Sequence, residues 1–83
     1  MKIYPNPARS TAHISIPSEL KEGGKLIVRK IGGEIIEKRN FSVSNSQILS
    51  LDLKKHPIGM YKVSLSNENA EFSTDLLHLL SSN

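Results

Sequence analysis

The sequence predicts an all-β protein, an immunoglobulin-like or fibronectin-III-like β-sandwich of about seven antiparallel strands. Three observations favour this fold class. Short stretches in which apolar and polar residues alternate recur along the 83 residues. Turn-forming residues separate these stretches about every 8–12 residues, which is typical of a sandwich. Within residues 49–65, two alternating stretches meet at a corner.

Residues 49–65 contain the clearest pair of predicted strands. Pro57 has no N–H for a sheet ladder and ends the first strand, and Gly59 permits backbone angles that are closed to other residues. The apolar side of the first strand is formed by Leu49, Leu51 and Leu53, with Ser50 and Asp52 opposite. In the second strand, the side chains of Tyr61, Val63 and Leu65 point inward. Those of Lys62 and Ser64 point outward.

Tyr61 follows this corner directly and has two interpretations. In Greek-key sandwiches, a tyrosine at such a place can donate a hydrogen bond from its hydroxyl to the backbone a few residues upstream, which fixes the corner. Alternatively, Tyr61 is simply a large, half-buried side chain. The residues favour neither interpretation over the other.

The N-terminal part is predicted to contain an edge strand, a turn and a second strand. Two X–Pro units in Tyr4–Pro7 exclude a helix, so the edge strand breaks into a turn there. In the stretch Thr11–Ile16, the polar residues His13 and Ser15 point toward solvent. The apolar residues Ala12, Ile14 and Ile16 point inward. Pro17–Gly24 is a connection that has room for one helical turn from Ser18.

The middle of the chain is predicted to form a hairpin. The strands Lys25–Ile31 and Glu34–Phe41 flank Gly32-Gly33, a two-residue loop of the kind that makes a tight turn. The apolar surface of this pair is formed by Leu26, Val28, Ile35 and Ile36. Ser42–Ser46 is a polar loop.

The C-terminal part is predicted to be a turn at Asn67–Asn69 and a strand over Ala70–Leu80. The strand begins with an alternation of Phe72, Thr74 and Leu76. Further leucines then blur this pattern and also fit a short terminal helix, although the neighbouring strands favour β structure: Leu77, Leu79 and Leu80. We expect exposed side chains at His78, Ser81 and Ser82.

Composition and charge indicate one small domain that binds no nucleic acid. The chain has no cysteine, a formal net charge of +3 and a pI of about 9.4. Its basic residues are interleaved with acids, which is typical of solubility, whereas nucleic-acid binding needs a dense basic patch with aromatic platforms. A weak attraction to polyanions is compatible with the net charge.

The sequence shows neither a transmembrane segment nor a secretory signal. The chain has no apolar run of about 18 residues, so we expect no transmembrane segment, and Met1–Pro5 lacks the hydrophobic region of a secretory signal. Because strand patterning starts almost at the first residue, we expect residues 1–83 to be a single domain excised from a longer protein, with Met1 added.

The sequence offers no catalytic, cofactor or metal site. The three histidines, at 13, 56 and 78, lack metal-ligand spacing. Asn67, Asn69 and Glu71 faintly resemble a calcium loop, but its glycine and its terminal glutamate are missing. No serine lies in a nucleophile elbow with a histidine and an aspartate as partners. We therefore expect a binding, sorting or structural domain that is not an enzyme and needs no cofactor.

Three sequence blocks carry a family resemblance. Ile3–Ala8 contains Y-P-N-P, Leu26–Ile36 contains a hydrophobic strand, a glycine turn and a return strand, and Pro57–Val63 reads P-x-G-x-Y-x-V. In this order and spacing, they resemble the C-terminal sorting domain family of the type IX secretion system (Por secretion system). The matched motif residues are Tyr4, Pro5, Asn6, Pro7, Gly33, Pro57, Gly59, Tyr61 and Val63.

The resemblance implies a folded secretion signal at the C-terminal end of a longer secreted protein. It implies recognition by outer-membrane translocon and shuttle proteins and by a surface sortase. The cargo would be periplasmic in transit, and then at the cell surface or extracellular, with its inner-membrane signal at the other end of the parent chain. The resemblance and the apolar last strand together suggest a translocon-recognition end at Leu76, Leu77, Leu79 and Leu80.

The sequence departs from the family pattern at two places. His56 stands where a leucine usually precedes the proline of the corner, which would loosen the packing there. Thr74 and Asp75 stand where lysines often precede the final hydrophobic residues, so recognition through terminal basic residues lacks support in this chain.

The alternative function is a non-catalytic, immunoglobulin-like accessory module of a secreted enzyme or adhesin, either carbohydrate-binding or a spacer. A sugar site needs exposed aromatic rings for stacking. Most of the four aromatic residues are expected to be structural, which favours sorting: Tyr4, Phe41, Tyr61 and Phe72.

Overall fold

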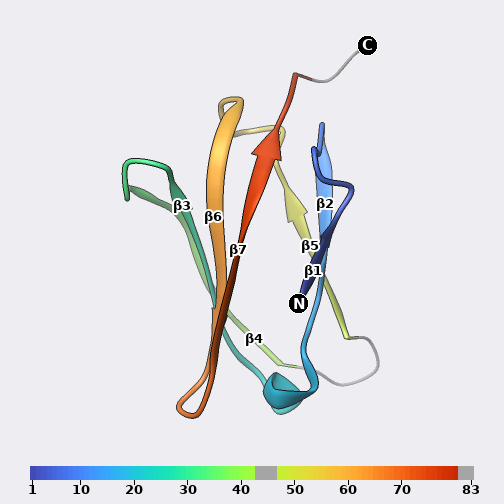
Figure 1. Cartoon of the computed structure of the whole chain (residues 1–83), viewed down its shortest axis with the longest axis vertical. Helices are drawn as coiled ribbons and strands as arrows, with labels where there is room; N and C mark the ends of the chain where they lie inside the picture. Colours follow the sequence, from blue (N-terminus) through green and yellow to red (C-terminus); the bar gives the residue numbers. More distant parts are fainter. Residues whose placement is uncertain (43–46, 81–83) are drawn as a thin grey trace.

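The computed structural model describes residues 1–42 and 47–80, which form two antiparallel sheets packed face to face (Figure 1). The three-stranded sheet has the order β1-β2-β5, with β1 at Lys2–Tyr4, β2 at Thr11–Ser15 and β5 at Ile48–Asp52. The four-stranded sheet has the order β4-β3-β6-β7, with β3 at Gly24–Lys30, β4 at Ile35–Phe41, β6 at Gly59–Ser66 and β7 at Glu71–His78. The predicted seven-stranded sandwich is confirmed.

The connections also follow the sequence pattern. A single helical turn, η1 at Ser18–Leu20, lies between β2 and β3 as predicted. The turn after β6 is held by Asn67, whose Oδ1 accepts hydrogen bonds from the N–H of Asn69 (2.7 Å) and of Ala70 (2.9 Å). Of the predicted polar loop Ser42–Ser46, residues 43–46 lie outside the described residues.

The core lies between the two sheets and is built by their inward alternations. Leu20 from η1 and Leu53 after β5 are also fully buried. From the three-stranded sheet, the fully buried side chains are Ala12, Ile14 and Leu51. From the four-stranded sheet, they are Leu26, Val28, Val63, Leu65 and Leu76. In β2, β3 and the first part of β6, the buried face is therefore the one that the period-2 pattern selects.

The β3–β4 hairpin has a three-residue loop, and the predicted two-residue loop is wrong. The N–H of Lys30 donates to the carbonyl of Glu34 (2.8 Å), and the N–H of Gly33 donates to the carbonyl of Lys30 (2.8 Å). These bonds enclose Ile31, Gly32 and Gly33, and Gly33 has a positive φ of 103°. Ile31, predicted to end a strand, instead lies in the loop and is 82% exposed.

A register shift next to this loop changes the predicted apolar surface. β3 and β4 pair as Val28 with Glu37 and then Arg29 with Ile35, so Ile36 is an extra residue in β4. The bulge turns Ile35 outward, where it is 43% exposed, and only Ile36 packs against the core. The prediction that both isoleucines form the inner surface is therefore wrong for Ile35.

Two polar residues are buried against prediction. Ser64 is 5% exposed although its side chain alternates away from the core, because β6 is a central strand and Ser64 lies between Ile27 of β3 and Ser73 of β7. His78 is 4% exposed because β7 remains a strand to its end, so the alternation of Leu76 continues inward at His78. The alternative of a short terminal helix over residues 76–80 is wrong. Ser81 and Ser82 lie outside the described residues.

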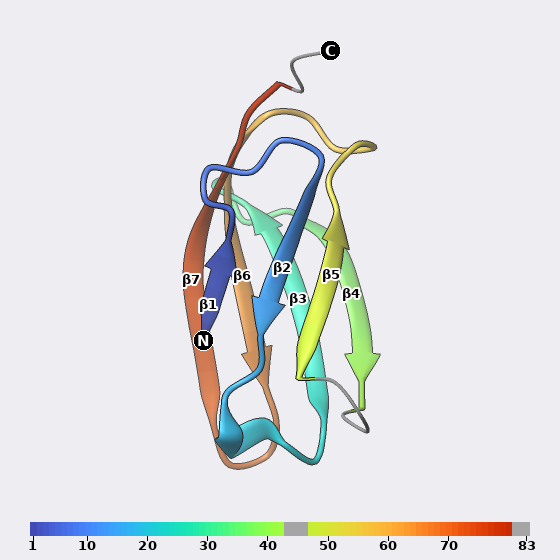
Figure 2. The ribbon, with the colours of Figure 1, turned by 90° about the vertical axis from the view of Figure 1, so that its right-hand side faces the viewer.

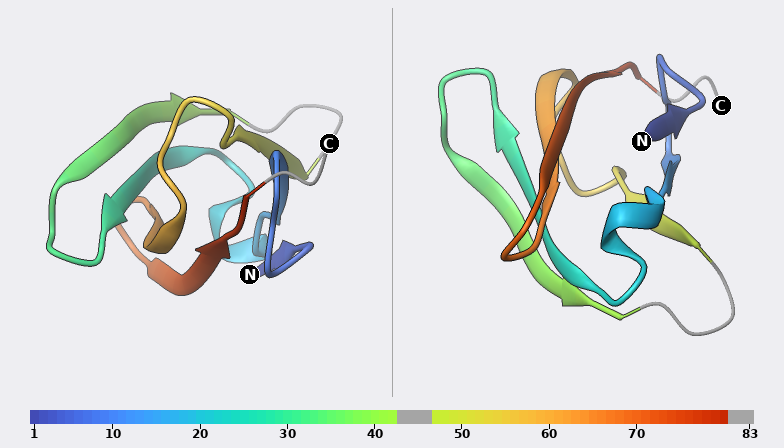
Figure 3. Two further views of the ribbon diagram at one scale, coloured as in Figure 1. Left: turned by 90° about the horizontal axis from the view of Figure 1, so that it is seen from above. Right: turned by 60° about the horizontal axis from the view of Figure 1, so that its bottom comes forward.

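The connections gather at two ends of the sandwich. Figures 1 and 2 show the turn after β1, the β3–β4 loop, the β5–β6 corner and the end of β7 at one end. The opposite end carries η1 and the β6–β7 turn, and Figure 3 looks at both ends in turn. In the part of the chain that the structure describes, no helix is long and apolar enough to cross a membrane.

A substitution of Gly24 tests how closely β3 approaches the end of β6. A Cβ at this position would lie 2.3 Å from the carbonyl oxygen of Ser66, which is backbone and cannot move aside cheaply. Gly24→Ala should therefore lower the free energy of unfolding by about 1–3 kcal/mol in urea titrations. Gly32→Ala is the matched control, since a Cβ there meets no atom within 4 Å. Equal effects of the two substitutions would contradict this packing.

Candidate recognition site

The segment that carries the Y-P-N-P motif pairs with the last strand. The N–H of Ala8 donates to the carbonyl of Leu77 (2.8 Å), and the N–H of Leu79 donates to the carbonyl of Ala8 (2.8 Å). These bonds form a parallel bridge between Ala8 and His78, and the Ala8 side chain is fully buried. The chain directly after β1 thus crosses to the edge of the other sheet. We call this pairing of residues 6–9 with residues 75–80 the clasp.

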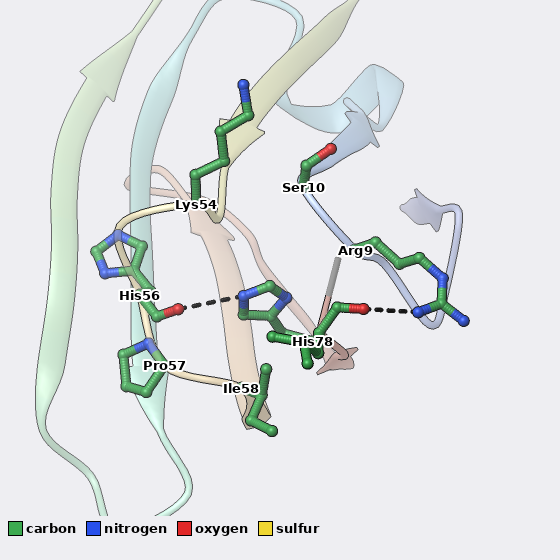
Figure 4. Close-up of a pocket in the computed structure, with 8 residues that line it drawn as sticks. Arg9, Ser10, Lys54, His56, Pro57, Ile58 and His78 are labelled. Carbon is green, nitrogen blue, oxygen red and sulfur yellow. Dashed lines mark hydrogen bonds between the residues drawn. The ribbon is translucent and has the colours of Figure 1, made fainter. Parts of the chain in front are cut away.

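The side chain of Asn6 lengthens the clasp. Its Nδ2 donates to the carbonyl of Asp75 (3.0 Å), and its Oδ1 accepts from the N–H of Leu77 (3.1 Å). A side-chain amide has both a donor and an acceptor, so Asn6 substitutes for a peptide group of an added strand. At the other end of the clasp, Nη1 of Arg9 donates to the carbonyl of Leu80 (2.6 Å; Figure 4).

Tyr61 fixes the β5–β6 corner. Its hydroxyl donates a hydrogen bond to the carbonyl of Pro57, and the residue is only 3% exposed. This confirms the interpretation in which the tyrosine hydroxyl fixes the corner. Gly59 lies between Pro57 and Tyr61 and has a φ of 145°, a backbone conformation that residues other than glycine rarely adopt. Burial raises the pKa of the Tyr61 phenol above its ordinary value of 10.0.

The buried ring of His78 connects the clasp to the corner. Its Nδ1 lies 3.3 Å from the carbonyl oxygen of Ala8, and its Nε2 lies 3.2 Å from the carbonyl oxygen of His56 (Figure 4). A neutral imidazole has one N–H and donates to only one of these carbonyls, whereas an imidazolium donates to both. The ring of Tyr61 lies beside it, with the ring centroids 6.4 Å apart. Three segments that are distant in sequence therefore meet at one side chain.

The structure separates the sequence-predicted residues into structural and accessible ones. The first and third motif blocks meet at His78, whose ring lies beside the carbonyl of Ala8 and the ring of Tyr61. Gly33 lies in the β3–β4 loop, at the same end of the sandwich (Figures 1 and 3). Val63 is fully buried in the core. The four leucines of the suggested recognition end also differ, because Leu76 is fully buried, Leu77 and Leu79 are half-buried, and Leu80 is 71% exposed.

Sequence reasoning missed His78, Ala8 and Arg9 as contributors to this site. The strand period could have placed His78 inward, since it lies two positions after Leu76. Nothing local in the sequence indicates the pairing of Ala8, because its partners are about 70 residues away. His56, a departure from the family pattern, takes part through its backbone carbonyl, and its side chain lines the cavity beside the corner.

A cavity of about 480 Å³ lies between the clasp and the corner (Figure 4). Its apolar lining includes Pro57, Ile58 and Leu80, and its polar lining includes Arg9, Ser10, Lys54, His56 and His78. Among the described residues, no group of histidine, aspartate and glutamate side chains could hold a metal ion. Arg9 and His78 contact the backbone of the clasp and the corner, and a cavity of this size suits contact with another molecule.

The fold and the site define a small β-sandwich whose motif residues close one end of the domain and do not assemble a reaction centre. The chain matches the family model of the secretion system C-terminal sorting domain over residues 2–77, and it belongs to this family. It is a type IX secretion C-terminal sorting domain, a non-catalytic part of a cargo protein directed to secretion or to the outer membrane. Neither the curated proteins nor the solved structures gave a match.

Tyr61 substitutions test the corner. Tyr61→Phe should lower the free energy of unfolding by about 1 kcal/mol through loss of the hydroxyl hydrogen bond, and Tyr61→Ala by about 3–5 kcal/mol through loss of the buried ring. Urea titrations at neutral pH measure both. A Tyr61→Ala protein within a few tenths of a kcal/mol of the wild type would contradict a packed corner.

The Tyr61→Phe protein also allows a test of the raised pKa. The phenol keeps its proton to a higher pH in the folded state than in the unfolded state. The stability that Tyr61 contributes is therefore complete below pH 10.0, and it is lost as pH rises through the folded-state pKa. The stability difference between wild type and Tyr61→Phe should therefore shrink above pH 10.0. An unchanged difference would contradict the effect of burial.

Asn6 substitutions test the clasp. Asn6→Ala removes one donor and one acceptor and should cost about 1–2 kcal/mol of unfolding free energy. Asn6→Asp keeps an oxygen for the N–H of Leu77 but loses the donor to Asp75, so it should also destabilise. The matched control is Asn40→Ala, an exposed asparagine on β4 at the opposite edge of the sheet. Amide hydrogen exchange should accelerate at Leu77 in the Asn6 variants, and unchanged exchange there would contradict the pairing.

Proposed function

We propose that this domain is the folded address of a cargo to which it is covalently joined, and that outer-membrane translocon and shuttle proteins recognise it. A surface sortase acts on it afterwards. The cargo is periplasmic in transit and then reaches the cell surface or the medium. The observation that carries the proposal is that the first and third motif blocks meet at one end of the sandwich, where the ring of His78 lies beside Ala8 and Tyr61. A surface that depends on the complete fold suits recognition of a folded signal.

Burial limits which leucines near the end of the last strand a partner can contact. Leu76 is fully buried, so a partner cannot contact it without unfolding the domain. Leu80 is 71% exposed and lies beside the cavity, where Arg9 holds its carbonyl. We therefore assign the accessible part of the recognition end to Leu80 and to the half-buried Leu77 and Leu79.

Export of a reporter tests the proposed function. Residues 1–83 are fused behind a reporter that has its own inner-membrane signal, in a host with a type IX system. The fusion should place the reporter at the cell surface or in the medium, and the reporter without the domain should remain in the periplasm. A known sorting domain on the same reporter is the positive control. If only that control is exported, the proposal fails and an accessory module becomes the better interpretation.

A point variant separates recognition from folding in this assay. Deletion of the end of β7 would remove Leu76 and His78 from the core and would block export merely by unfolding the domain. Leu80→Ser changes an exposed side chain instead, and should reduce export without changing the urea midpoint. Full export of the Leu80→Ser fusion would contradict a role of this end in recognition.

A further inference from the structure

Exposed apolar side chains gather around the β5–β6 corner. Among the described residues, seven large hydrophobic side chains are exposed, and four of them lie here: Ile31 (82%), Ile58 (58%), Met60 (38%) and Leu80 (71%). They come from four segments, the β3–β4 loop, the corner, β6 and the chain after β7. Separate apolar residues on a surface are ordinary, but a contiguous group at one site indicates contact with another molecule.

These side chains border three hollows that adjoin one another. The cavity of about 480 Å³ shares Pro57 and Ile58 with a hollow of about 210 Å³. That hollow shares Ile31 and Met60 with a third, of about 370 Å³, on the four-stranded sheet. Because neighbouring hollows have common walls, they form one continuous surface. We call it the corner patch.

The corner patch is strongly basic. Among the described residues, its hollows are lined by five of the chain's eleven lysines and arginines, namely Arg9, Arg29, Lys30, Lys54 and Lys62. Asp75 is the acidic residue that lines them. Lys30 also has an exposed partner in Glu34, at 3.6 Å. By contrast, a hollow of about 430 Å³ at the opposite end is lined by one cation, Lys25, and one acid, Glu68.

We infer that the corner patch is the docking surface for an acidic loop of a recognising protein, a loop that places apolar side chains in the hollows and carboxylates beside the surrounding cations. This inference rests on the proposed function and names the chemistry of the partner. Charge complementarity of this kind steers association and excludes wrong partners. Apolar anchors in hollows supply most of the binding energy at such interfaces.

A protein fits the patch better than a membrane surface does. The apolar residues line concave hollows together with five lysine and arginine residues, and each hollow is large enough to take apolar side chains of a partner. Binding to a bilayer instead requires a continuous apolar face that inserts below the headgroups. Pro57, Gly59 and Tyr61 of the corner motif also line the patch, so the residues that shape the corner are the ones that shape the hollows.

The export assay tests the inference with paired variants. Lys54→Glu combined with Lys62→Glu should reduce surface reporter about tenfold, and Ile58→Ser should do the same. The charge control is Lys25→Glu with Lys38→Glu, which changes the net charge equally elsewhere on the domain. The apolar control is Ile48→Ser, where the isoleucine is 47% exposed on β5. Both controls should export normally, and urea titrations should give all four variants wild-type folding.

The outcomes separate the inference from the proposed function. If the wild-type fusion is not exported, the proposed function fails. If the wild-type fusion is exported and the patch variants match their controls, the inference alone is overturned.

A binding measurement decides between the two kinds of occupant. The purified domain is titrated with a synthetic peptide of alternating aspartate and leucine and, separately, with phosphatidylglycerol vesicles. Saturable NMR shifts at Ile31, Ile58 and Leu80 with the peptide, lost in the Lys54→Glu, Lys62→Glu protein, support the inference. A peptide of alternating lysine and leucine should cause none. Binding to vesicles through the same residues, without binding to the acidic peptide, would overturn it in favour of a membrane surface.

Discussion

The pairing of Ala8 with the last strand is the interaction on which the rest of the structure depends. Two sheets that pack face to face leave open edges, and this chain has no cysteine to join them covalently. The backbone of Ala8 crosses from one sheet to the edge of the other, and Asn6 and Arg9 extend the contact on either side. An edge strand with unpaired backbone groups invites association with other chains. The clasp satisfies those groups at the end of β7.

Around this pairing, one buried ring connects the fold to its surface. The ring of His78 lies within hydrogen-bond distance of two backbone carbonyls, that of Ala8 in the clasp and that of His56 at the β5–β6 corner. Tyr61 restrains the same corner from within through Pro57. The motif residues Asn6, Pro57 and Tyr61 therefore shape this end of the fold through their hydrogen bonds. A rigid support of this kind gives the exposed side chains above it a defined arrangement, which recognition of a folded signal requires.

Prediction from the sequence succeeded where the pattern is local. The period-2 alternations located the strands and their buried faces, and the spacing of Pro57 and Tyr61 indicated the corner bond as one of two alternatives. It failed where the answer depends on distant partners. Ile35 faces solvent because a bulge shifts the register of its strand, and neither residue type nor period signals that shift. The leucines near the end of β7 also blur the period-2 pattern, so the sequence does not show that His78 points inward.

The clasp joins residues separated by about 70 positions in a chain of 83, which determines when it forms during folding. Contacts of high sequence separation form late, because much of the chain must first be ordered. A polypeptide that stops before residue 77 has no partner for Ala8 and no ring to hold the corner. Such a copy cannot assemble the complete end of the sandwich. The complete end of the sandwich therefore exists only in a chain whose last strand has been made.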